Sequence, residues 1–311
     1  MNRRAVLVFA LVGLLWGSSW IPASEVIKQV PELRAGAIRF AVAAAAIAIF
    51  LPVARRPRAE EPVRFSAPLF RNALVLGVTA LALPYFLVVR ASGHISSAAI
   101  PTLFAFMPFI ALLLAKETIS ALIPALAIGI CGVVMLVAQG LSFSLAQLGG
   151  ALLVFCAVVS GAFSLNYAKK HLRRPDLLFS CAIQFVVATV LLGAASVATE
   201  HAPLSIDPTT VHWLLVLGIV ISAVTLPLLY WLLTKFEAWQ VALLQWISTL
   251  GAVAEASCLL RAGPSPGQAV GAACIIGAIF YLVSCPETVT PRSTSRAIEG
   301  STASDCEVGS D

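Results

Sequence analysis

The sequence predicts an all-α, polytopic membrane protein whose ten transmembrane helices form two inverted five-helix repeats. Three observations support this fold class: the composition, the length of the apolar runs, and the distribution of basic residues among the loops. Of the 311 residues, 59% are hydrophobic and only 11% are charged, whereas globular domains carry about 25% charged residues. So few charges could not cover the surface of a soluble protein. The seven cysteines, most of them inside apolar runs, do not form a secreted disulfide scaffold.

The apolar runs have the length of membrane-spanning helices. A helix needs about 20 mostly apolar residues to cross the hydrocarbon core. The chain contains ten unbroken runs of 18 to 23 residues, unlike the short alternating segments of an outer-membrane barrel. In chain order they span residues 5–23, 35–54, 69–89, 95–115, 121–139, 147–168, 177–198, 211–233, 238–260 and 268–285. The first run continues through Trp20 to Pro22 without the usual cleavage site, which favours a retained helix over a signal peptide.

The basic residues predict the orientation of these helices. Short cytoplasmic loops carry an excess of Lys and Arg. With ten spans and a cytoplasmic N-terminus, 15 of the 20 basic residues fall on the cytoplasmic side. We therefore expect a multi-pass protein of the cell (inner or plasma) membrane with both termini in the cytoplasm. The net charge of +5 follows from this topology and is no evidence for a nucleic-acid partner.

Several landmarks recur after 143 to 145 residues and predict an internal repeat. The matched pairs are Gly17 and Gly161, Pro84 and Pro227, and Gly132 and Gly277. The chain therefore divides into residues 1–140 and 141–285, followed by a disordered cytoplasmic tail at 286–311 that is rich in Ser, Thr and acidic residues. An odd number of helices in each half forces the halves into opposite orientations. Inverted repeats of this kind are typical of carriers, which exchange two shapes around a central site.

Short motifs in both halves add a family resemblance. They are Trp16-Gly17-Ser18-Ser19-Trp20 in the first run, Arg39-Phe40 in the second, Pro108 leading to Lys116-Glu117 in the fourth, and Gln268-x-x-Gly271 leading to Gly277 in the last. With the ten-helix layout, they resemble the EamA-type transporters of the drug/metabolite transporter superfamily over about residues 1–285. The resemblance implies a central cavity and the export of metabolites or drugs. Many members of the family export amino acids or related metabolites. It also implies a gating or structural role for Glu117 at the cytoplasmic rim, although a solvated charge pair with Lys116 is an alternative.

Two charged residues inside the runs are candidate functional groups, because ionisable side chains in a membrane are costly. Arg39 lies about four residues into the second run. It either snorkels to the interface or forms a fixed cation at the cavity mouth that holds a carboxylate or braces the helix ends. Glu255 either carries a proton or is an interfacial or structural carboxylate. Gln245, Ser248, Ala252 and Glu255 follow one another at steps of three and four, which suggests a polar helix face toward the cavity.

Aromatic and hydroxyl side chains complete the predicted cavity. Trp16 and Trp20 are four residues apart and should share a helix face, with Ser18 and Ser19 between them. Tyr85 and Trp231 follow two prolines, Pro84 and Pro227, which we interpret as bend points of the gating motion. In full, the cavity candidates are Trp16, Ser18, Ser19, Trp20, Tyr85, Trp231, Gln245 and Ser248, and the gating or hinge candidates are Pro84, Pro227 and Glu117.

These patterns favour a carrier over an enzyme or a channel. A membrane enzyme would need acids, bases or metal ligands gathered at one depth, and the sequence contains neither such a cluster nor a metal or cofactor motif. We expect a secondary transporter that exports small metabolites, most of all amino acids or related compounds, with no metal and no cofactor. A multidrug or lipophilic-compound exporter is the alternative. The expected partners are a small-molecule substrate and the lipid bilayer, and two complete halves in one chain are compatible with a functional monomer.

Overall fold

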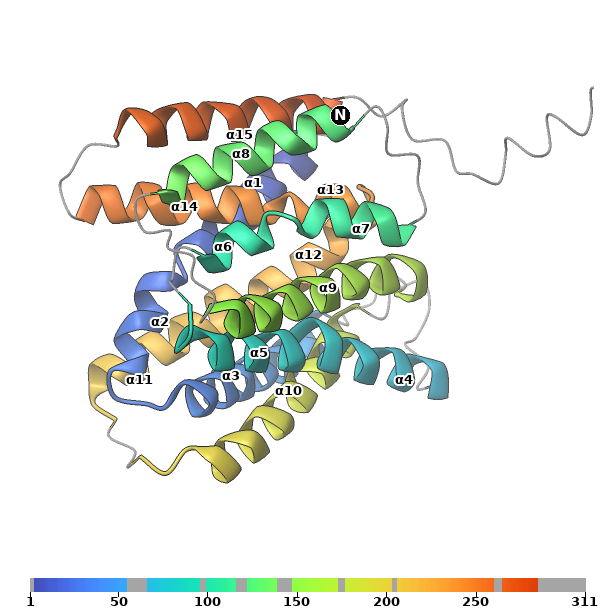
Figure 1. Cartoon of the computed structure of the whole chain (residues 1–311). Helices are drawn as coiled ribbons and strands as arrows, with labels where there is room; N and C mark the ends of the chain where they lie inside the picture. The colour runs from blue at the N-terminus through green and yellow to red at the C-terminus, as the bar shows by residue number, and fades with distance from the viewer. Residues whose placement is uncertain are drawn as a thin grey trace, which may run out of the picture.

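The computed structural model describes residues 3–54, 66–95, 99–115, 122–138, 147–172, 177–202, 206–259 and 265–284. All regular structure within these ranges is helical (Figure 1). The all-α fold class is therefore confirmed for this part of the chain. The predicted tail at 286–311 and the loop residue Glu117 lie outside the described residues.

The first half consists of helices that are in several places broken or widened. Its α-helices are α1 (Arg3–Gly17), α2 (Trp20–Ile27), α3 (Glu32–Ala54), α4 (Ala67–Leu76), α5 (Leu83–Ser92), α6 (Ala99–Phe104), α7 (Met107–Ala115) and α8 (Ile123–Val137). Between α4 and α5 the backbone widens into a π-helical segment, η1 (Gly77–Ala82). Because α4, η1 and α5 follow one another without a gap, they form one long helix.

The second half repeats this order of elements. Its helices are α9 (Leu148–His171), α10 (Leu177–Thr199), α11 (Pro208–Leu215), α12 (Thr225–Leu233), α13 (Ala238–Ala242), α14 (Leu244–Leu259) and α15 (Pro266–Ser284). A second π-helical segment, η5 (Val216–Val224), joins α11 to α12. The two π-helical segments therefore occupy corresponding places in the two halves.

Each of the ten predicted runs falls on helix, but their lengths differ from the prediction. Six helical stretches are long and apolar enough to cross a membrane: Arg3–Ile27, Glu32–Leu51, Ala67–Ser92, Leu148–His171, Leu177–Thr199 and Pro208–Leu233. The other runs are covered by the shorter helices Ala99–Ala115, Ile123–Val137 and Pro266–Leu282 and by the pair α13 and α14. The long spans confirm a multi-pass membrane protein.

The prediction of unbroken helices is wrong in three places. The first run is interrupted between α1 and α2, the fourth between α6 and α7, and the ninth between α13 and α14. Hydropathy measures only the apolar character of a segment. It therefore does not reveal a helix break at which side chains hydrogen-bond to the backbone groups that the break leaves unpaired. At the first break, the Ser18 and Ser19 hydroxyls donate hydrogen bonds to the carbonyls of Leu15 and Trp16, at 3.1 and 2.7 Å.

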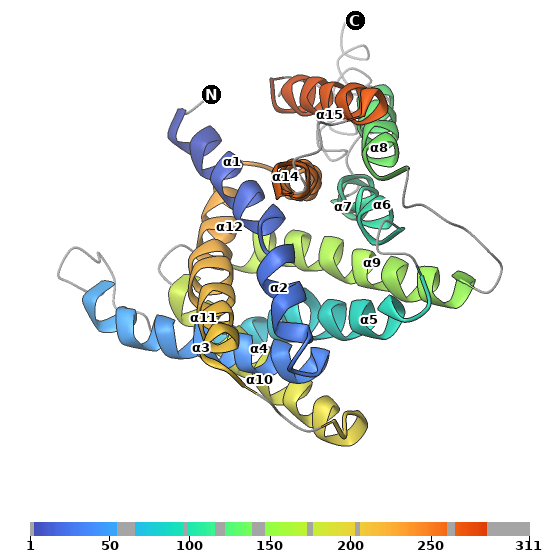
Figure 2. The ribbon, with the colours of Figure 1, turned by 90° about the vertical axis from the view of Figure 1, so that its left-hand side faces the viewer.

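Corresponding helices of the two halves pack against each other in pairs. The second run of each half, α3 and α10, forms one pair, and the last run of each half, α8 and α15, forms another (Figures 1 and 2). Helix α1 packs against α14, and its counterpart α9 packs against α6 and α7. This reciprocal pattern fits a two-repeat architecture, in which each half packs on the other through equivalent helices.

Glycines allow the closest of these helix crossings. A Cβ atom on Gly132 of α8 would lie 2.7 Å from the carbonyl oxygen of Gly271, and one on Gly271 would lie 2.7 Å from the Gly132 oxygen. A Cβ on Gly17 of α1 would lie 2.6 Å from the Ser248 oxygen of α14. Small residues at crossings are the usual means of helix association in lipid. Gly277, the sequence match of Gly132, has open space around it instead.

Large apolar side chains cover the outside of the bundle. Leu7, Ile49, Val197 and Phe280 are between 63% and 77% exposed. Apolar side chains exposed on this scale are unfavourable in water but favourable in lipid. The outer surface therefore agrees with the membrane assignment made from composition.

Candidate functional site

Each half widens into its π-helical segment immediately before the landmark proline. Proline has no backbone N–H and cannot bond to the preceding helical turn, and π-helical insertions occur mostly at functional sites. In the first half, the Thr79 carbonyl lies five residues before Pro84 and accepts a hydrogen bond from the Ser160 hydroxyl of α9 at 2.8 Å. A neighbouring helix thus satisfies a backbone group that the helix itself leaves open.

The second π-helical segment supplies polar groups to the space between the halves. The Ser222 hydroxyl donates to the Leu217 carbonyl at 2.9 Å, and the Thr225 hydroxyl, in the first turn of α12, donates to the Ile221 carbonyl. Both hydroxyl oxygens are therefore left free to accept. Ser222 accepts from Arg39 Nε at 2.8 Å, and Thr225 accepts from Trp16 Nε1 at 3.0 Å.

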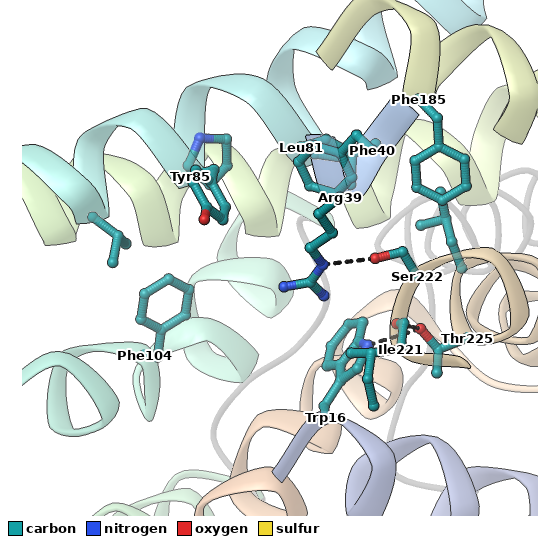
Figure 3. Close-up of a pocket in the computed structure, with 14 residues that line it drawn as sticks. Trp16, Arg39, Phe40, Leu81, Tyr85, Phe104, Phe185, Ile221, Ser222 and Thr225 are labelled. Carbon is teal, nitrogen blue, oxygen red and sulfur yellow. Dashed lines mark hydrogen bonds between the residues drawn. The ribbon is translucent and has the colours of Figure 1, made fainter. Parts of the chain in front are cut away.

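A cavity of about 260 Å³ lies beside these hydrogen bonds (Figure 3). It is lined by Trp16, Arg39, Phe40, Ala80, Leu81, Pro84, Tyr85, Val88, Phe104, Phe185, Ile221, Ser222, Thr225 and Leu226, from both halves of the chain. An adjoining cavity of about 220 Å³ shares six of these residues and extends past Met107 and Ser164 to Tyr230 and Gln245. The two cavities form one central space between the halves.

Arg39 is the charged residue of this lining. Its side chain is half-buried, and Figure 3 shows the guanidinium extending into the cavity between Trp16, Tyr85 and Phe104. No carboxylate among the described residues forms an ion pair with it. The structure thus places the Arg39 side chain in the cavity lining.

Aromatic rings surround the guanidinium. The Phe40 ring lies 5.9 Å from the Tyr85 ring in an edge-to-face arrangement and 5.8 Å from the Phe185 ring in a stacked one. The Tyr85 hydroxyl donates to the Glu32 carbonyl at 3.2 Å, which holds the ring in the wall. The cavity therefore combines one cation with an apolar, aromatic wall.

The structure separates several residues that the sequence predicted together. Trp16 lines the cavity, whereas Trp20, on the other side of the break between α1 and α2, is 46% exposed. Ser18 and Ser19 do not line the cavity; their hydroxyls stabilise the break. Trp231 packs against the hydrophobic core, while its neighbour Tyr230 lines the central space.

The predicted polar face of α14 is also divided. Gln245 lines the central space, whereas Ser248 is 4% exposed and lies in the crossing with Gly17. Glu255 is half-buried, lies outside the cavity lining, and has one carboxylate oxygen buried without a hydrogen-bond partner in the described structure. The stripe therefore reaches the cavity at one position only.

The two predicted hinge prolines differ in position. Pro84 lines both parts of the central space, and Pro227 is half-buried outside it. Ser222 and Thr225, which accept hydrogen bonds from Arg39 and Trp16, are not among the residues predicted from the sequence. Their signal was present, since they are hydroxyl side chains in the apolar run that leads to Pro227.

A further cavity lies at the end of the bundle that carries Lys169. Its volume is about 300 Å³, and it shares Tyr230 with the central space. The Tyr230 hydroxyl donates to Gln184 Oε1 at 2.5 Å, and Gln184 Nε2 donates to the Ser180 hydroxyl at 2.9 Å. This buried network holds the Tyr230 ring between the two cavities.

The bundle is apolar on its outside, and its central cavity is lined by residues of both halves. The chain belongs to the EamA-like transporter family, whose model matches residues 3–138 and again residues 148–284. A crystal structure of another protein aligns over 90% of this chain and 96% of its own, with a TM-score of 0.74 and 16% identity, which shows a shared fold. No curated protein matches the sequence.

Proposed function

We propose that this transporter exports small metabolites, most of all amino acids or related compounds, by alternating access around the central cavity. The family supports membrane transport. The observation that carries the substrate proposal is the single cation, Arg39, in a cavity otherwise lined by aromatic, aliphatic and hydroxyl side chains. Such a lining suits a solute with one anionic group and an apolar body. A multiply phosphorylated sugar would need more cations than this lining supplies.

Alternating access requires that the two ends of the bundle open in turn. At the end of the bundle where α5 ends at Ser92, the Glu200 carboxylate accepts hydrogen bonds from the backbone N–H groups of Leu33 and Arg34 at 2.7 and 3.0 Å. Gln29 also donates to Asp207 at 2.9 Å. These contacts join α10 to the start of α3, and α2 to the start of α11.

At the opposite end, the polar contacts of the described residues include those of Lys169. Lys169 of α9 donates to the Phe236 carbonyl at 2.8 Å and pairs with Glu237 at 3.1 Å. Both charged side chains are partly exposed, and exposed ion pairs contribute at most about 1 kcal/mol. In the proposed cycle, this end opens by release of Lys169 and displacement of Tyr230, and the end that carries Glu200 and Asp207 opens in the alternate step.

Counterflow in proteoliposomes tests the proposed function. Vesicles are loaded with an unlabelled amino-acid mixture, and the uptake of labelled amino acids is followed with and without an imposed pH gradient. Saturable uptake that depends on the internal load supports a carrier and identifies the substrate. The absence of uptake across the whole amino-acid panel contradicts the proposed substrate class.

Export of lipophilic compounds is the second candidate, and the apolar wall of the cavity favours it. The same vesicles distinguish the two, because a drug exporter would exchange lipophilic cations or neutral dyes and ignore amino acids. Glu255 is the intramembrane acid that a proton-coupled cycle would use. A Glu255→Gln variant that keeps full dependence on the pH gradient would eliminate this role.

A further inference from the structure

Two arginines of α3 have opposite surroundings. The protein binds all three side-chain nitrogens of Arg34: Nε, Nη1 and Nη2 donate to Ser196 Oγ, the Ala202 carbonyl and the Glu200 carbonyl, at 3.3, 3.3 and 3.1 Å. Arg39 lies five residues further along and uses only Nε, toward Ser222. No described residue hydrogen-bonds to its two terminal nitrogens. Arg34 therefore has the contacts of a structural residue, whereas the Nη1 and Nη2 donors of Arg39 face the cavity without a partner in the described structure.

The cavity lining contains no carboxylate that could bind Nη1 and Nη2 of Arg39. No Asp or Glu is among the residues that line either part of the central space. The nearby carboxylates of Glu32 and Glu200 are bonded elsewhere, Glu32 to Ser92 and Glu200 to the start of α3. An unpaired cation within a membrane is unfavourable. An anionic solute would therefore neutralise Arg39 as it binds.

We propose that Arg39 binds the carboxylate of the transported solute through Nη1 and Nη2, and that the substrate class is apolar or aromatic monocarboxylates whose amino group is not recognised. This inference rests on the proposed function and makes it more specific. The planar guanidinium matches a carboxylate in a two-bond arrangement. Ser222 holds Nε and so directs the other two nitrogens into the cavity, while Trp16, Tyr85 and Phe104 contact the apolar body. An amino acid is accepted through its carboxylate, and its ammonium group meets no carboxylate in the lining.

The test uses three ligands with the same phenyl body: phenylalanine, 3-phenylpropanoate and 2-phenylethylamine. The second lacks the ammonium group, and the third lacks the carboxylate. Binding to the full chain in detergent is measured by ligand-induced thermal stabilisation, and each compound is also used to inhibit counterflow. We expect 3-phenylpropanoate to bind within about threefold of phenylalanine, and 2-phenylethylamine to bind at least about tenfold more weakly, as expected for the loss of a charge-assisted hydrogen-bond pair.

Variants locate the effect at Arg39. We expect Arg39→Gln to weaken binding of the two acids by about 10- to 100-fold, without weakening the amine, and Arg39→Lys to restore part of the affinity. Arg90→Gln is the matched control, since it removes the same charge from an exposed position on α5 and should leave acid binding unchanged.

Several outcomes would overturn the inference. One is an amine that binds wild-type protein as tightly as the acids, and another is a stable Arg39→Gln variant that keeps acid binding within twofold. If Arg39→Gln does not fold, Arg39→Lys and the three-ligand series on the wild-type chain decide the question. If none of the three ligands binds the wild-type protein, the inference fails. The proposed function fails separately, when counterflow detects no amino-acid exchange.

Discussion

The segment from Ser66 to Ser92 and the segment from Asp207 to Leu233 occupy corresponding places in the two repeats. Each begins with a side-chain cap, Ser66 accepting from the Leu69 N–H and Asp207 from the Thr210 N–H. Each continues through a proline in the first turn, a glycine packed on a neighbouring helix, a π-helical segment and a second proline. The same local sequence features therefore occur with the same π-helical widening in both repeats.

The chemistry of the two segments differs. In the first, the Thr79 hydroxyl donates back to the Val75 carbonyl, and the open carbonyl of Thr79 itself is satisfied from outside by Ser160. In the second, Ser222 and Thr225 satisfy carbonyls of their own helix and present their oxygens to Arg39 and Trp16. The repeats thus share an architecture, while the second one carries the polar anchors of the cavity. Each of the following predictions compares a change in the second segment with a change in the first segment or at a residue that bonds to it.

The largest expected effect comes from filling the packed glycines. A Cβ on Gly218 would lie 2.5 Å from Val42 Cγ1 and 2.9 Å from the Arg39 oxygen, and a Cβ on Gly77 would lie 2.8 Å from Val187 Cβ. We expect alanine at either position to lower the free energy of unfolding by about 1–3 kcal/mol, as overpacking does elsewhere, with only Gly218→Ala also displacing Arg39. Thermal unfolding in detergent measures the effect. Gly277→Ala, in open space on α15, is the control and should be neutral or stabilise by up to about 1 kcal/mol.

Removal of the Ser222 hydroxyl should affect mainly substrate affinity, whereas removal of the Ser160 hydroxyl should affect mainly stability. Ser222→Ala removes the group that positions Arg39, so we expect KM for counterflow to rise by roughly fivefold, corresponding to about 1 kcal/mol, with little change in kcat. Ser160→Ala leaves the Thr79 carbonyl open and should lower stability by about 0.6 kcal/mol, with KM unchanged. Equal changes of KM in the two variants would contradict the division of roles between the repeats.

Substitution of the prolines tests whether the π-helical segments take part in the transport cycle. Alanine restores a backbone N–H, so Pro84→Ala and Pro227→Ala should straighten their helices. We expect each variant to be as stable as the wild type or more so, and to transport a few-fold more slowly, which rapid counterflow measurements would detect. Unchanged rates in both variants would remove the hinge role of the prolines.

The smallest expected effect concerns the two caps and pH. The hydrogen bond from the Gln29 side chain, together with those from Thr210, lowers the pKa of Asp207 below its ordinary value. A lowered pKa in the folded state means that Asp207 contributes stability above its ordinary pKa of about 3.9 and loses it as pH falls through the lower folded value. We therefore expect the wild type to melt at a higher temperature than Asp207→Asn near neutral pH. This difference in melting temperature, measured by thermal unfolding at decreasing pH, should disappear in acid. Ser66→Ala provides the comparison, since Ser66 does not titrate and its contribution should not change over this range.

Much of the architecture could be predicted because it depends on local composition. Ten apolar runs, the repeated prolines and an arginine placed within an apolar run are visible without any tertiary information. Arg39 in particular stood out because a charge inside a membrane requires a reason. The grouping of Trp20 with Trp16 extends an ideal helix through the break between α1 and α2, whereas Trp231 is predicted only because it follows Pro227.

The partners of Arg39 could not be derived in the same way. Ser222 is separated from Arg39 by 183 positions, and nothing in its own run distinguishes a cavity hydroxyl from one that bonds to its helix. The π-helical widening decides this by turning Ser222 toward α3. A helix of uniform pitch would have placed the side chain differently.

The sequence by itself determined that the protein lies in a lipid bilayer, how many apolar runs it has, that it contains a repeat, and that an arginine lies within an apolar run. Each of these features depends on residue type and spacing alone. The tertiary structure decided which side chains meet at the cavity. Helix breaks, π-helical segments and glycine crossings each rotate a helix face by a fraction of a turn. Those rotations add up only when both repeats are packed together, and they are what leaves the guanidinium of Arg39 open to a solute.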